Sequence, residues 1–126
     1  MDKKDLESQA TILINLFNSR RFEDAIQKGK ILIKKFPNQL IFYNATALSL
    51  SALGKNEEAL KILKSALNLR PNDIFVLNNL GLIKSNTNQN KQSREYLEKA
   101  ISINPNFMDA LPVSYTHLRA HETSAN

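Results

Sequence analysis

Apolar residues recur along the chain with the spacing of amphipathic helices. Within residues 40–73 they occupy positions Leu40, Tyr43, Ala47, Leu50, Ala59, Leu60, Leu63, Ala66 and Leu67. Steps of three and four residues predict two helices of about thirteen residues each, separated near Gly54. Gly54 suits the end of the first helix, because a residue without a Cβ readily adopts the left-handed backbone that closes many helices. Asn56, followed by two glutamates, suits the start of the second. We therefore expect this segment to form a helical hairpin.

The same pattern repeats at a constant interval along the chain. Pro37, Pro71 and Pro105 are equally spaced, and each is followed by Asn. Proline lacks an N–H and clashes with the preceding turn, so each of them should end a helix. Alignment on the prolines gives a lead-in and three complete units, followed by the start of a fourth: 1–5, 6–39, 40–73, 74–107 and 108–111. The predicted helices are 4–18, 22–35, 40–53, 56–69, 74–87 and 90–103.

The units resemble the tetratricopeptide repeat, whose 34-residue signature is W-x2-L-G-x2-Y, then A-x3-F, then P. The middle unit carries Tyr43, Thr46, Ala47, Leu50, Ala59, Leu63, Ala66 and Pro71, and the third carries Leu77, Leu80, Gly81, Lys84, Ser93, Leu97, Ala100 and Pro105. The resemblance implies an all-α fold of three helical hairpins stacked as a right-handed α-solenoid.

The first unit departs from the signature in the size of its residues. Leu13 and Leu32 replace small residues, whereas Gly29 replaces a large one. An exchange of this kind preserves total volume, so we expect local packing to be kept.

The last residues, 112–126, have no counterpart in the earlier units. They resemble a translated sequencing adapter read through from a truncated gene, so we expect them to be a non-native tail. His117 and His121 lie four residues apart beside Glu122, a spacing that could place two imidazoles on one helix face. Since both histidines of the chain belong to this tail, we predict no metal site.

Composition narrows the function further. The 126 residues include no Cys, and removing the tail leaves no His, so a Ser-His or Cys-His catalytic pair cannot form. We therefore expect a chain that is not an enzyme and needs no cofactor. The amino terminus lacks a signal-peptide cleavage pattern, and no apolar stretch is long enough to cross a bilayer, so we expect a cytoplasmic protein without a membrane partner.

The net charge of +5 raises the question of nucleic-acid binding. Lys28, Lys30, Lys34 and Lys35 crowd one predicted second helix. No aromatic residue alternates with these lysines to stack on bases, and second helices should form the outer surface. The pattern favours a solvated face, and we expect no nucleic-acid partner.

The resemblance also implies a candidate binding site, because the first helices of stacked repeats line a concave groove. The residues expected to face it are Ile14, Phe17, Ile41, Asn44, Leu48, Phe75, Asn78, Asn79 and Leu82. The aliphatic members would form an apolar strip, and the asparagines could bind a peptide backbone. The alternative is that the aliphatic residues only seal contacts between neighbouring repeats. The carboxylate clamp of chaperone-binding members is not expected, since the corresponding positions here are mostly apolar.

Two functional hypotheses follow. The first is a non-catalytic scaffold that binds a protein or an extended peptide in the groove. The second is the substrate-recruiting arm of a longer enzyme, of sulfotransferase or glycosyltransferase type, whose catalytic domain is missing from this chain. In either case the fourth unit, which would cover the second helix of the third repeat, is incomplete. That helix should therefore expose apolar surface, and we also expect self-association there.

Overall fold

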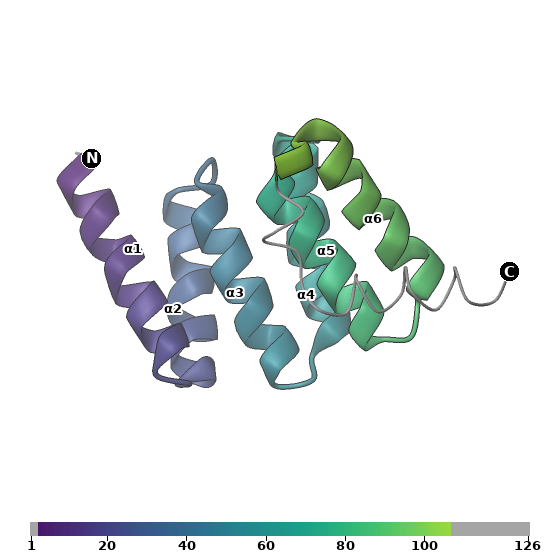
Figure 1. The fold of residues 1–126 in the computed structure, drawn as a ribbon. Coiled ribbons are helices and arrows are strands. Elements are labelled where there is room, and N and C mark those ends of the chain that lie inside the picture. The colour runs from purple at the N-terminus through teal and green to yellow at the C-terminus, as the bar shows by residue number, and fades with distance from the viewer. Residues whose placement is uncertain (1–2, 107–126) are drawn as a thin grey trace, which may run out of the picture. The chain divides into compact units, whose positions relative to one another are not determined.

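The structure is a computed structural model and describes residues 3–106. These residues form six helices and contain no strand: α1 (Lys3–Asn18), α2 (Phe22–Lys35), α3 (Leu40–Ala52), α4 (Asn56–Leu69), α5 (Ile74–Asn86) and α6 (Asn90–Ile103) (Figure 1). The predicted bounds differ by one residue at three helix ends and agree at the others. The expected start of a fourth unit at 108–111 and the expected tail at 112–126 lie outside the described residues.

The turn inside each hairpin has the same left-handed geometry. Arg20, Gly54 and Asn88 have φ angles of 61°, 80° and 62°, and they occupy the same position of the three repeats. In each turn the following N–H donates to the carbonyl five residues earlier, at 2.9 Å: Arg21 to Leu16, Lys55 to Leu50, and Gln89 to Lys84. This pattern is the Schellman closure of a helix, and it occurs once per repeat. The prediction for Gly54 is confirmed.

Two helix starts differ in how they are capped. Asp73 precedes α5, and its Oδ1 accepts hydrogen bonds from the backbone N–H groups of Phe75 and Val76 at 3.1 and 3.0 Å. Asn56 is the first residue of α4, as the predicted range 56–69 has it. Its side-chain oxygen accepts a hydrogen bond from the Ser51 hydroxyl at 2.7 Å, which ties α3 to α4.

The chain divides into two compact units, one with α1–α4 and one with α5 and α6. In the first unit α1 packs on α2 and α3, and α3 packs on α2 and α4. A central cluster of buried side chains joins its first three helices: Leu13, Ala25, Leu32, Phe42 and Ala45. Burial of these apolar groups is the main stabilising contribution to the unit.

The exchange of volumes expected within the first repeat stays a prediction, because the nearest side chain to Gly29 is Thr46 of the second repeat. Leu13 and Leu32 are fully or almost fully buried, at 0% and 2% exposure. Gly29 lies where α2 approaches α3, and a Cβ at this position would overlap the hydroxyl of Thr46. The missing side chain at Gly29 therefore makes room for Thr46.

The second unit contains a similar close approach. A Cβ at Gly81 would lie 2.5 Å from Leu97 Cγ, so α5 and α6 need a glycine at this contact. The Ser93 hydroxyl donates to the Gly81 carbonyl at 2.7 Å and is fully buried. Lys84 is also buried, and its ammonium donates to Gln89 Oε1 at 2.8 Å.

Candidate functional site

Five of the predicted groove residues lie in the first unit, on the helices α1 and α3. Ile14, Phe17, Asn44 and Leu48 are half-buried, whereas Ile41 is 44% exposed. The two helices pack against each other, so these side chains belong to one pair of adjacent elements. Ile14 also packs against the central cluster of the unit. The cluster contains residues of the first and second repeats, so Ile14 takes part in the contact between these two repeats. This contact supports the alternative role considered for the aliphatic groove residues.

The other four predicted residues lie on α5. Phe75 is 59% exposed, Asn78 and Leu82 are half-buried, and Asn79 is buried at 9% exposure. The side-chain oxygen of Asn78 is inaccessible to solvent and lacks a hydrogen-bond partner in the described part of the chain. Asn44, Phe75 and Asn79 each have an interaction partner within the protein. Among the asparagines, Asn78 therefore retains an acceptor for an additional donor.

Equivalent positions of successive first helices have similar exposure. Ile41 and Phe75 occupy the same position of the second and third repeats, and both present a large apolar side chain to solvent. Leu48 and Leu82 are equivalent in the same way and are both half-buried. Equal exposure in two repeats makes this position a candidate for contact with another molecule.

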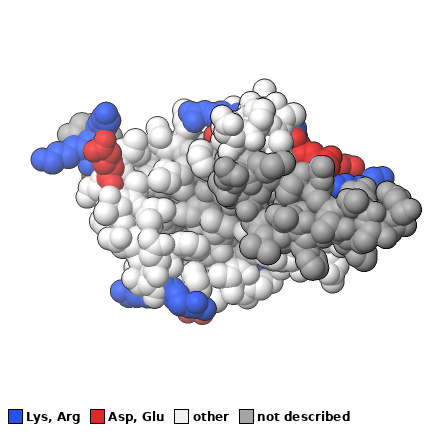
Figure 2. All heavy atoms as spheres, in the orientation of Figure 1, with Lys and Arg blue, Asp and Glu red and all other residues white. Residues whose placement is uncertain are grey.

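Charged side chains are sparse over α1 and α3. Figure 2 shows a largely uncharged surface over these two helices, with Lys, Arg, Asp and Glu gathered near the helix ends. The lysines of α2 lie elsewhere: Lys30 is exposed and pairs with Glu58 of α4 at 3.7 Å. This pairing agrees with a solvated basic face, and the expected absence of a nucleic-acid partner stays a prediction.

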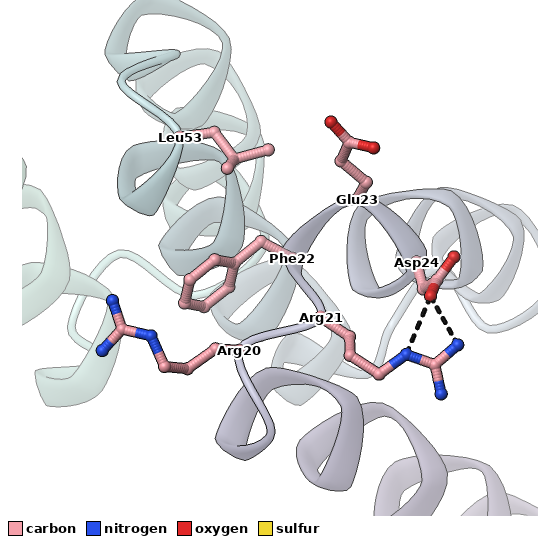
Figure 3. Close-up of a pocket in the computed structure, with 6 residues that line it drawn as sticks. All are labelled: Arg20, Arg21, Phe22, Glu23, Asp24 and Leu53. Carbon is pink, nitrogen blue, oxygen red and sulfur yellow. Dashed lines mark hydrogen bonds and ion pairs between the residues drawn. The ribbon is translucent and has the colours of Figure 1, made fainter.

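A separate pocket of about 310 Å³ lies at the turn between α1 and α2 (Figure 3), lined by Arg20, Arg21, Phe22, Glu23, Asp24 and Leu53. Arg21 donates to Asp24 Oδ2 from both Nε and Nη2, at 3.0 and 2.7 Å. The guanidinium of Arg20 lies over the Phe22 ring, 5.9 Å from its centre. No pattern in the sequence indicated this pocket, because the fold brings Leu53 to it from the end of α3.

Other kinds of site are not evident in residues 3–106. No three acidic or histidine side chains there are grouped so that they could hold a metal ion. No helix in the same residues has the length and apolarity needed to cross a membrane. His117 and His121, whose spacing suggested a metal site, lie outside the described residues.

Comparison with solved structures identifies the fold. The chaperone SycD of Yersinia enterocolitica, in complex with a peptide of the translocator YopD, aligns with a TM-score of 0.84 at 14% identity, covering 99% of this chain and 98% of that chain. PcrH, in complex with the chaperone-binding region of PopD, aligns with 0.82 at 12% identity, covering 100% and 97%. The Sgt2 tetratricopeptide-repeat domain of Aspergillus fumigatus aligns with 0.83 at 21% identity, covering 95% and 80%. The predicted tetratricopeptide fold is confirmed.

The sequence matches one family model over most of its length. The model describes the Psidin N-terminal tetratricopeptide-repeat region, and the match covers residues 11–122. The chain therefore belongs to this family. The matched span includes part of the predicted non-native tail, whose origin stays a prediction. No curated protein matches the sequence significantly.

Proposed function

We propose that this protein is a non-catalytic scaffold that binds an extended peptide or a protein segment through its first helices. The observation that carries the proposal is the exposure of Ile41 and Phe75, at 44% and 59%, at the same position of two successive repeats. Water contact with two large apolar side chains is unfavourable, and burial against a partner would remove it. Each of the two units thus presents one large apolar side chain to a partner.

Asn78 supplies the polar part of the proposed site. Its buried side-chain oxygen has no hydrogen-bond partner among the described residues. An unsatisfied buried acceptor is costly, so turning the Asn78 side chain toward the surface, where a ligand donor could reach its oxygen, would stabilise the complex. A backbone N–H of an extended peptide is such a donor, and it is present whatever the peptide sequence. Asn78 would therefore contribute affinity, while the surfaces around Ile41 and Phe75 would contribute specificity.

The structural neighbours support a peptide or protein partner. SycD is bound to a peptide of YopD, and PcrH to a region of PopD. At 14% and 12% identity these proteins share the fold with this chain, and their partners do not transfer to it. None of the proteins compared above is named as an enzyme, so the enzyme-arm hypothesis receives no support from them.

The proposal can be tested with peptides selected from a random library on the full chain, followed by calorimetric titration of the best binder. The variant Ile41→Ala with Phe75→Ala should weaken binding by about tenfold or more, since loss of two contacts at an interface commonly costs over about 1.4 kcal/mol. Asn78→Ala should weaken binding by about fivefold, the equivalent of about 1 kcal/mol for one hydrogen bond.

Ile31→Ala provides the matched control. Ile31 is 58% exposed, close to the value for Phe75, but it lies on the second helix α2. This variant should bind the selected peptide as the unmodified chain does. Equal affinity of the Ile41→Ala, Phe75→Ala variant and the unmodified chain would exclude the proposed surface.

A further inference from the structure

The backbone at Arg20 is unusual for its residue type. Arg20 takes a left-handed conformation with a φ of 61°, in the turn between α1 and α2. The equivalent positions in the other two repeats hold Gly54 and Asn88, the residue types that adopt this conformation most readily. A long side chain gives no local advantage in such a turn. The backbone conformation itself closes α1, as it does the first helix of the other repeats, so the side chain is what sets Arg20 apart.

The side chain of Arg20 is exposed, contacts an aromatic ring and is not neutralised. Its guanidinium lies over the Phe22 ring, and it forms no ion pair with any residue from 3 to 106. The neighbouring Arg21 is different, because both its Nε and Nη2 donate to Asp24. Arg20 therefore keeps a planar set of donors that suits a carboxylate.

The pocket beside Arg20 is lined by two apolar residues, by the Arg21–Asp24 ion pair and by one further charge. Phe22 and Leu53 line it, and Leu53 is 40% exposed. In Figure 3, Arg20 and Glu23 lie on opposite sides of the Phe22 ring. Glu23, like Arg20, forms no ion pair within the described range. The pocket thus presents a cation, an apolar surface and an anion in sequence.

The pocket is also connected to the proposed binding surface. The rings of Phe17 and Phe22 meet edge to face, with their centres 5.7 Å apart. Phe17 is one of the predicted groove residues on α1. A volume of about 310 Å³ is at the lower end for ligand sites, so the pocket suits one or two side chains and is small for a cofactor.

We propose that this pocket is a specificity subsite for a peptide in which an apolar residue stands between an acidic and a basic residue. The acidic side chain would pair with Arg20, the apolar side chain would contact Phe22 and Leu53, and the basic side chain would pair with Glu23. This inference rests on the proposed function, since it takes the partner to be a peptide. It adds the charge pattern that the partner carries.

The test uses the full chain labelled with ¹⁵N and four blocked tripeptides: Ac-Asp-Leu-Lys-NH2, Ac-Asp-Leu-Asp-NH2, Ac-Lys-Leu-Lys-NH2 and Ac-Asp-Ala-Lys-NH2. Amide chemical shifts of Phe22 and Leu53 report the pocket, and the amide of Ile41 reports the groove. Ac-Asp-Leu-Lys-NH2 should bind the pocket most tightly. Ac-Asp-Leu-Asp-NH2 and Ac-Lys-Leu-Lys-NH2 each reverse one charge of this peptide. Each should bind about two- to fivefold more weakly, the range for exposed ion pairs.

Two charge reversals should change the preference in opposite directions. Arg20→Glu should make Ac-Lys-Leu-Lys-NH2 the best ligand, and Glu23→Arg should make Ac-Asp-Leu-Asp-NH2 the best ligand. Lys61→Glu, which makes the same charge change on α4 as the first variant, should leave the order unchanged. Arg20→Gly places the residue of the second repeat in the first, keeps the turn geometry, and should remove the discrimination at the acidic position.

The outcomes separate this inference from the proposed function. If Arg20→Glu and Glu23→Arg leave the order of the peptides unchanged, or if Lys61→Glu changes it equally, the subsite is excluded. Groove binding detected at Ile41 would still stand in that case. If the library-selected peptide perturbs neither the pocket nor the groove, the proposed function fails and the subsite fails with it.

Discussion

The contact between α2 and α3 at Gly29 predicts a non-additive effect on stability. A Cβ on residue 29 would overlap Thr46 Oγ1 and lie 3.0 and 3.2 Å from Thr46 Cβ and Cγ2. Thr46 is fully buried, and its hydroxyl donates to the Phe42 carbonyl at 2.6 Å. A β-branched side chain in a helix has few rotamers, so Thr46 has little freedom to move away.

The size of the effect follows from two opposing contributions. Replacing Gly by Ala inside a helix stabilises it by about 1 kcal/mol. Forcing an extra methyl group into a packed interior costs about 1–3 kcal/mol, and overlap with a locked side chain places Gly29→Ala at the upper end. The net expectation is a loss of about 2 kcal/mol in the free energy of unfolding.

The same substitution should behave differently when Thr46 is already Ala. Thr46→Ala removes Oγ1 and Cγ2, and the two Cβ atoms then need to separate by only a few tenths of an ångström. The higher helix propensity of Ala over Gly should compensate for the remaining strain. Gly29→Ala should therefore change the stability of the Thr46→Ala protein very little. The coupling energy between the two sites is then about 2 kcal/mol, well above the roughly 0.5 kcal/mol scatter of additive pairs.

Urea unfolding of the four proteins, followed by far-ultraviolet circular dichroism, measures this coupling. The unfolding midpoint and its slope should both be compared, because an altered slope would signal loss of two-state behaviour. An equal loss of stability from Gly29→Ala in both backgrounds would refute the close contact between Gly29 and Thr46. A gain of stability from Gly29→Ala alone would refute it too.

Three further predictions concern other parts of the molecule. Asp73→Ala should lower stability by about 1 kcal/mol through loss of the cap on α5, whereas Asp73→Asn should keep most of it; thermal unfolding of both variants measures the difference. Gly54→Ala should lower stability by about 1–2 kcal/mol, because Gly54 has a φ of 80°. The loss comes from the backbone alone, since nothing lies within 4 Å of the added Cβ. Gly54→Asn should lower stability less in the same assay. Ile103, 42% exposed on α6, should contribute to the expected self-association, so Ile103→Lys should reduce the dimer fraction in sedimentation equilibrium; a chain that is monomeric at every concentration contradicts this.

Most of the secondary structure could be predicted from local patterns. The equal spacing of Pro37, Pro71 and Pro105 marks the helix ends after each hairpin, because proline acts on the turn that precedes it. Apolar periodicity then locates the helices, and the described helices agree with it to within one residue at each end. These signals are local in the chain, so a single sequence is sufficient to read them.

The turns inside the hairpins show where local signals become ambiguous. Gly54 predicts a left-handed residue, but Arg20 in the same position of the first repeat does not. Its conformation is imposed by the helices on either side, which must reverse direction within a short turn. Repeat alignment alone could have suggested it, since Arg20, Gly54 and Asn88 occupy equivalent positions.

The sequence by itself determined the repeat period, the helices and the positions equivalent from one repeat to the next, because these depend on near neighbours along the chain. Tertiary structure decided how far each predicted groove residue is buried: Asn79 is 9% exposed, and the side-chain oxygen of Asn78 is closed to solvent and lacks a hydrogen-bond partner among the described residues. It also brought Leu53 to Arg20 and Phe22, forming the pocket. Burial and pocket formation depend on packing between helices distant in sequence, and residue spacing alone does not specify that packing.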